Sequence, residues 1–178
     1  MKKLKPIFPY CISYLCAGAL GYLFHYLFKF FSSSPFVAPF FPINESVFEH
    51  LKLLLYPFML VSIIEILIQK KKFQSTLPYR IFGITFSIIF LPIVYYILKR
   101  LFGNIHIGNI LLYFVFLFLS YFITYWFEKK ETTPNKSIAI LAYCTLFLLV
   151  FLFTILTYLP PEAELFKDPT LQTYGYLF

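Results

Sequence analysis

The feature that most constrains this chain is a series of five apolar runs. An apolar run of about 20 residues is long enough to cross the hydrocarbon core of a bilayer as an α-helix. Hydrophobic residues make up 60% of the 178-residue chain and charged residues 13%, whereas about a quarter of a soluble domain is charged. We therefore expect an all-α integral membrane protein, forming one transmembrane domain over residues 1–178. Its predicted helices cover residues 7–31, 46–70, 77–98, 107–127 and 138–159, and a tail covers 160–178.

The connection between the first two predicted helices is rich in proline and phenylalanine. Three prolines between residues 32 and 44 alternate with phenylalanines, a combination too interrupted for a helix and too apolar for open water. This composition predicts a loop that lies along the membrane interface or folds into the bundle.

The distribution of basic residues predicts the orientation in the cell membrane. They fall at the ends of the apolar runs, where they act as topology signals and contact lipid headgroups. Nucleic acid is therefore not an expected partner, despite a net charge of +7. With a cytoplasmic N-terminus and an extracytoplasmic C-terminus, ten of the fifteen basic residues lie inside, as the positive-inside rule requires. The five outside are Lys29, Lys52, Lys99, Arg100 and Lys167.

A polar stretch over residues 41–52 begins the second predicted helix and carries two carboxylates, an imidazole and an amine. Ser46 and Glu49 have the spacing of a capping box, so helix capping explains part of the stretch. Capping does not explain His50 and Lys52, which would be costly to expose to lipid. We expect a functional site here, with Glu49 and His50 as an acid/base pair.

The predicted orientation places all three histidines, His25, His50 and His106, on the outer side. His25 lies about 27 Å along the first helix at 1.5 Å per residue, which is the depth of Glu49 and His50 at the start of the second. The prediction is an outward-opening pocket that binds a small polar ligand or a lipid headgroup and is closed by the tail. Its expected ligand-binding residues are His25, Lys29, Asn44, Glu45, Ser46, Lys52, Asp168 and Tyr174.

Several functions fit such a pocket. One is a binding, transport or accessory role, and a face around Ala17 and Gly21 could pack closely against a partner helix. The alternative is a membrane-embedded hydrolase or transferase that acts on a lipid or lipid-linked substrate, with or without a metal. No motif requires a cofactor, and adjacent Glu49 and His50 point about 100° apart on a helix, which weakens a shared zinc site. A zinc site would draw on His25, Glu45, Glu49 and Asp168.

The polar stretch also has the form Pro42-x-Asn44-Glu45-Ser46-x-Phe48-Glu49-His50-x-Lys52. In this it resembles a signature of an uncharacterised family of small bacterial polytopic membrane proteins, in which tryptophan is more common at the position of Phe48. The resemblance extends to His25 and to the ending 165–169 followed by Tyr174-Gly175. It implies the same membrane architecture and draws attention to these residues, but it implies no activity.

Overall fold

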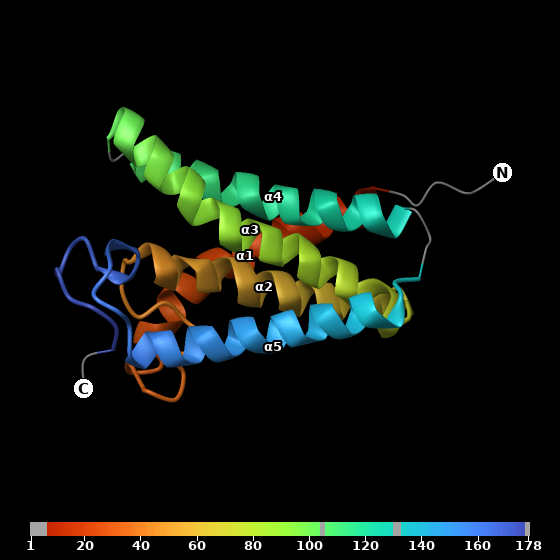
Figure 1. Cartoon of the computed structure of the whole chain (residues 1–178), viewed down its shortest axis with the longest axis horizontal. Coiled ribbons are helices and arrows are strands. Elements are labelled where there is room, and N and C mark those ends of the chain that lie inside the picture. Colours follow the sequence, from red (N-terminus) through yellow and green to blue (C-terminus); the bar gives the residue numbers. More distant parts are fainter. Residues whose placement is uncertain (1–6, 104–105, 130–132, 177–178) are drawn as a thin grey trace.

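The computed structural model describes residues 7–103, 106–129 and 133–176, and for residues 106–107 only the backbone. The described residues form helices and no extended strand, and each long helix is apolar and long enough to span a bilayer. This confirms the predicted all-α membrane class. The helices are α1 (Phe8–Phe30), α2 (Val47–Ile68), α3 (Phe73–Phe102), α4 (His106–Lys129), α5 (Lys136–Tyr158) and the short 3-10 helix η1 (Glu164–Phe166) (Figure 1).

The second helix is the centre of the bundle (Figure 1). α2 packs against α1 and α3, and α3 packs in turn against α4 and α5. A helix that is apolar on all sides is stable when it is surrounded, and 67% of the most apolar segment of α2 is buried, against 11% in α5. α2 can therefore present its polar first turn to residues from several other elements.

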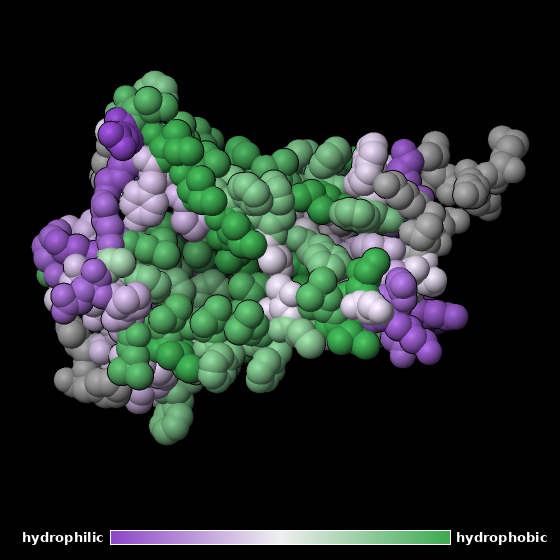
Figure 2. All heavy atoms as spheres, in the orientation of Figure 1, coloured by the Kyte–Doolittle hydropathy of each residue, from purple (hydrophilic) through white to green (hydrophobic). Residues whose placement is uncertain are grey.

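Exposed apolar side chains form a broad band between two polar ends (Figure 2). On α5, for example, the large side chains of Phe147, Leu148 and Ile140 are more than half exposed. Such an extensive apolar surface is not expected in water but matches the hydrocarbon region of a bilayer. We name the end that carries residues 31–46 and the tail the histidine end, and the opposite end, where α2 joins α3, the arginine end.

The observed α3 extends four residues beyond each end of the predicted range 77–98. Lys99 and Arg100 lie in its last turn, where positive charge interacts favourably with the helix dipole. The helix ends at Gly103, whose φ of 77° is a conformation that glycine adopts without strain. The other four helices differ from their predicted ranges by one or two residues at each end, which is the ordinary uncertainty of helix termini.

The face around Ala17 and Gly21, predicted to meet a protein partner, packs inside the chain instead. Ala17 is fully buried. A Cβ atom on Gly21 would collide with the Tyr113 hydroxyl and lie 3.2 Å from the Leu53 carbonyl oxygen. The small residues therefore let α1 approach α2 and α4 closely, and the expectation of a partner on this face is corrected.

The proline- and phenylalanine-rich connection folds against the histidine end. Ala38, Pro39 and Pro42 are buried, whereas Phe36 is 87% exposed and Phe40 is also exposed. The prolines restrict the backbone and so lower the entropy lost when the loop is ordered. Exposed phenylalanines in a loop between two membrane-spanning helices suit a membrane interface.

The tail returns to the same end. Phe166 packs on Phe48 with ring centroids 4.7 Å apart, and the backbone N–H of Tyr176 donates to the Thr157 carbonyl oxygen at 2.9 Å. Gly175 has a φ of 59°, and a Cβ there would lie 2.6 Å from Pro160, so this return requires glycine. The tail thereby closes over the first turn of α2.

Candidate functional site

Two imidazoles and a carboxylate from three different elements meet at the histidine end. The Nε2 atom of His25 in α1 lies 3.6 Å from Oε1 of Glu45. The Nε2 atom of His50 in α2 lies 3.5 Å from the other carboxylate oxygen. The imidazole centroids are 5.4 Å apart. We name this group the histidine cluster.

The hydrogen bond on the other side of His50 determines which ring nitrogen carries a proton. Nδ1 of His50 lies 2.8 Å from the Ser46 carbonyl oxygen. A carbonyl oxygen can only accept, so Nδ1 carries the hydrogen. In the neutral ring Nε2 then has a free lone pair, and it is this atom that faces Glu45. The backbone of α2 thus holds His50 in a tautomer suited to binding a proton or a metal ion.

Asp168 from the tail supports the cluster from behind. Asp168 is 1% exposed, and its Oδ2 accepts the backbone N–H of Glu45 at 3.1 Å. Its Oδ1 accepts the backbone N–H groups of Thr170 and Leu171. Burial alone would raise the pKa of Asp168, but these three backbone donors hold it below its usual value. The ionised carboxylate therefore fixes the position of Glu45.

Glu49 and Lys52 form a separate buried ion pair. Their charged atoms are 2.6 Å apart, and the side chains are 2% and 0% exposed. Lys52 also donates to the Ala38 carbonyl oxygen at 2.8 Å, and Glu49 accepts the Ile43 N–H at 3.0 Å. Both partners therefore attach the connecting loop to α2. The predicted pocket shared by Glu49, Lys52 and the histidines is not the arrangement seen here.

The remaining predicted residues lie around the cluster. Ser46 is the N-cap of α2 and accepts the N–H of Glu49 at 3.3 Å, while Asn44 accepts the N–H of Ser46 at 2.9 Å. Lys29 lies in the last turn of α1. Tyr174 pairs with Lys167 in an isolated antiparallel bridge. Asn44 and Ser46 thus shape the local backbone, and of the predicted ligand-binding residues His25 and Glu45 converge with His50.

A polar cavity of about 240 Å³ adjoins the cluster between α3 and the tail. It shares Glu45 with the cluster and includes two amines, Lys99 and Lys167. Lys99 pairs with Glu164 at 2.6 Å. Glu164 also lines the cavity, and the other lining residues are Val47, Tyr95, Tyr96, Pro169 and Gln172.

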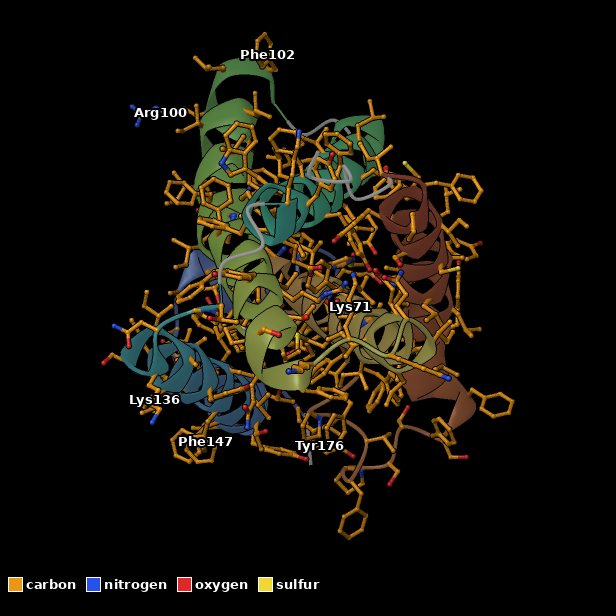
Figure 3. All side chains as sticks on the ribbon, turned by 90° about the vertical axis from the view of Figure 1, so that its right-hand side faces the viewer. Lys71, Arg100, Phe102, Lys136, Phe147 and Tyr176 are labelled. Atoms are coloured by element: carbon orange, nitrogen blue, oxygen red, sulfur yellow. The ribbon has the colours of Figure 1, made fainter. Side chains whose placement is uncertain are left out.

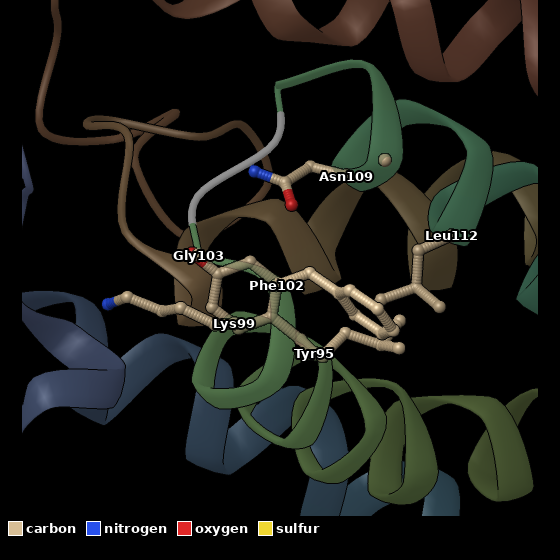
Figure 4. Close-up of a pocket in the computed structure, with 8 residues that line it drawn as sticks. Tyr95, Lys99, Phe102, Gly103, Asn109 and Leu112 are labelled. Carbon is tan, nitrogen blue, oxygen red and sulfur yellow. The ribbon is translucent and has the colours of Figure 1, made fainter.

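A second, more apolar cavity of about 160 Å³ lies beside the first and shares Tyr95 and Lys99 with it. In Figure 4 the rings of Tyr95 and Phe102 and the side chain of Leu112 lie together, while the amine of Lys99 points away from them. The cavity is also lined by Leu98, Gly103, Gly108 and Asn109. The two cavities together offer a charged compartment next to an apolar one.

A family model described as "Family of unknown function (DUF6512)" matches residues 9–176. The chain belongs to this family. The matched range contains the histidine cluster, both cavities and all of the five long helices except Phe8, the first residue of α1. It agrees with the resemblance to a family without assigned activity. The signature and a bacterial origin stay predictions. No curated protein and no solved structure matches the chain.

The arginine end of this family member holds a second charged group. Arg80 is fully buried and donates to both carboxylate oxygens of Glu65 at 2.9 Å. Its Nε donates to Glu128 at 3.1 Å. Lys71 lies 3.0 Å from Glu128 and projects into the middle of the bundle in an end-on view, unlike peripheral Lys136 (Figure 3).

Hydroxyl groups complete this arginine network. Tyr10 donates to Glu128 and Ser13 donates to Glu65, both at 2.6 Å. The sequence analysis treated Arg80 only as a topology signal. A sharper rule could have found the network, because a charge inside an apolar run requires a partner of opposite charge, and Glu65 and Arg80 both lie within such runs.

Proposed function

We propose that this membrane protein binds a lipid with a phosphate-bearing headgroup at its histidine end. The observation that carries the proposal is the pair of adjacent cavities that share Tyr95 and Lys99, one polar and one apolar. An amphipathic molecule has the same division between headgroup and acyl chain. Both cavities are lined by the last turns of α3, where Leu101 and Phe102 are exposed apolar residues, and this supports a ligand that comes from the bilayer.

The polar cavity has the groups that a phosphate ester needs. Lys167 supplies positive charge, as does Lys99, which also pairs with Glu164. Charge-assisted hydrogen bonds to phosphate oxygens are stronger than neutral ones. The buried hydroxyl of Tyr96 has no hydrogen-bond partner within residues 7–103, 106–129 and 133–176. A buried polar group without a partner is unfavourable, so a headgroup oxygen that accepts this hydrogen would be stabilised.

Lipid binding can be measured by native mass spectrometry in detergent, with dioctanoyl phosphatidylglycerol as the probe. We expect Lys167→Gln and Tyr96→Phe each to weaken binding about tenfold, the value of one charge-assisted or buried hydrogen bond. Lys136→Gln, at the arginine end, is the matched control and should bind as the wild type does. Equal binding of glycerol phosphate would identify a soluble phosphate ligand instead, and unchanged affinity in both variants would refute the proposal.

The proposed orientation places the histidine end outside the cytoplasm, with the N-terminus inside. The excess of lysine and arginine on the other side supports it. Single cysteines introduced at Lys136 and Glu162, after replacement of Cys11, Cys16 and Cys144, would report it through a membrane-impermeant maleimide. In intact cells the label should react at position 162 and not at 136. The reverse pattern would invert the topology.

A hydrolase or transferase is the second candidate, and one observation favours it. The Glu45 carboxylate lines the polar cavity and also lies beside both imidazoles, so a general base would face a bound headgroup. Glu49, the predicted partner of His50, is paired with Lys52 instead. Mass spectrometry of phospholipid incubated with purified protein tests this: turnover should disappear in Glu45→Gln while lipid binding persists. If Glu45→Gln still turned the lipid over, Glu45 would have no part in the mechanism. If the wild type bound lipid without turnover, a transport or accessory role would account for the binding.

A further inference from the structure

We propose that His25, Glu45 and His50 form a binding site for a divalent transition-metal ion of the zinc class. Two imidazole nitrogens and a carboxylate are common ligands of zinc sites that keep an open coordination position. The three residues come from α1, the connecting loop and α2, and one ligand atom from each lies within 4.8 Å of the others. The proposal does not depend on the headgroup proposal.

The distances between these groups fit a shared ion. Two ligands bound tetrahedrally to zinc at about 2.0–2.2 Å are about 3.4 Å from each other. The two imidazole Nε2 atoms lie 3.6 and 3.5 Å from the Glu45 carboxylate oxygens. Direct hydrogen bonds between such atoms are shorter, at 2.7–3.2 Å. Each imidazole faces a different oxygen of Glu45, so the separations suit an ion bound through both carboxylate oxygens better than direct contact.

The tautomer of His50 supports the same conclusion. Its Nδ1 hydrogen is donated to the Ser46 carbonyl oxygen, so in the neutral ring the Nε2 lone pair faces an ionised carboxylate. Two lone pairs at this distance repel each other unless a positive charge lies between them. A metal ion supplies that charge and binds the neutral imidazole, and the outer hydrogen bond is the arrangement that orients metal-binding histidines.

Two other candidate ligands are already occupied. Glu49 is paired with Lys52 at 2.6 Å, and Asp168 accepts three backbone N–H groups, including that of Glu45. The metal set that the sequence predicted thus keeps His25 and Glu45, replaces Glu49 by His50 and moves Asp168 into a supporting position. Asp168 is then a positioning residue that holds the backbone of a ligand.

The exposure of the ligands indicates an open site. The side chains of His25, His50 and Glu45 are 28%, 38% and 49% exposed, so water reaches the ion. Three protein ligands leave a fourth position for water or for an oxygen of a bound molecule. Glu45 also lines the polar cavity, and that fourth position would lie next to it.

The test is zinc binding by the full-length protein in detergent, without added lipid. After equilibration with Zn²⁺ and removal of excess, elemental analysis should find one zinc per chain. His25→Gln, Glu45→Gln and His50→Gln should each weaken zinc affinity at least tenfold. Glu162→Gln changes an exposed tail carboxylate at the same end and should bind as the wild type does.

Thermal unfolding with and without Zn²⁺ separates lost binding from lost folding. The wild type should unfold at a higher temperature with zinc, because a ligand that binds only the native state stabilises it. A folded variant without this shift supports the proposal. A wild type that takes up no zinc, or wild-type zinc affinity in all three variants, overturns the metal proposal. Either result leaves the lipid-binding proposal intact, since that measurement uses no metal.

Discussion

The two ends of this bundle both concentrate charge, but they treat it in opposite ways. At the arginine end, Arg80 and Glu65 are buried and bound to each other through two hydrogen bonds of 2.9 Å. At the histidine end, Glu45 is half exposed and faces two imidazoles at 3.5 and 3.6 Å. The charges at the arginine end bind one another, whereas the histidine cluster can still bind a ligand.

This difference separates structural charge from functional charge. A buried ion pair whose donors and acceptors are all satisfied has nothing left with which to bind a ligand, and it holds helices together. A polar group at the surface with free lone pairs can accept a proton, a metal ion or a substrate. Glu45 and Glu49 are four residues apart and show the contrast, because Glu49 is paired with Lys52 whereas Glu45 faces the two imidazoles and is half exposed.

The largest effect is expected at the arginine end. Arg80→Met would leave Glu65 and Glu128 buried beside a single amine, and removal of one partner from a buried ion pair costs about 3–5 kcal/mol. Thermal unfolding in detergent should detect it, with Arg100→Met as an exposed control. Adding Glu65→Gln and Glu128→Gln should restore part of the stability. An unchanged unfolding temperature in Arg80→Met would mean that the network does not hold the helices.

The pair between Glu49 and Lys52 sharpens the comparison at the histidine end. Lys52→Met leaves a buried carboxylate without its partner and should destabilise the protein by about 3 kcal/mol. The double variant Glu49→Gln/Lys52→Met should recover most of this loss, as measured by the same unfolding assay. If Glu49→Gln were fully stable but failed to bind dioctanoyl phosphatidylglycerol, Glu49 would act in the binding site as the sequence predicted.

Asp168→Asn tests how far the tail supports the cluster. An asparagine places an amide where three backbone donors need a charged acceptor, so we expect a loss of about 1–2 kcal/mol. Zinc affinity should also fall by about tenfold, the usual effect of removing an outer-shell partner. Limited proteolysis of the tail and zinc titration measure the two effects. A tail that stays protected with unchanged zinc affinity would show that Asp168 does not position Glu45.

The smallest stability change is expected at the open carboxylate. Glu45→Gln changes only half-exposed contacts with the two imidazoles, and exposed contacts of this kind contribute little, so stability should change by less than about 1 kcal/mol. The same variant should lose zinc. A large loss of stability would place Glu45 with the structural charges and erase the contrast between the two ends.

Much of the histidine end could be predicted from local pattern. Ser46 and Glu49 have capping spacing, and Ser46 is the N-cap. The depth of His25 along α1 placed it level with the start of α2, and the two imidazoles do meet. Sequence spacing could not predict that Lys52 turns inward to the Ala38 carbonyl oxygen, because that contact depends on the path of a loop without regular structure. The sequence analysis therefore grouped Lys52 with the ligand-binding residues.

Sequence by itself determined the class of this protein, because run length and composition decide what a bilayer will accept. It also determined the cap of α2 and the level at which the histidines lie, since both follow from spacing along a helix. Tertiary structure decided which charges close on one another and which stay open. The outcome depends on contacts between residues far apart in sequence, such as Arg80 and Glu128, which are 48 positions apart. It also depends on burial, because the same residue types form a stabilising ion pair when buried together and a binding site when exposed.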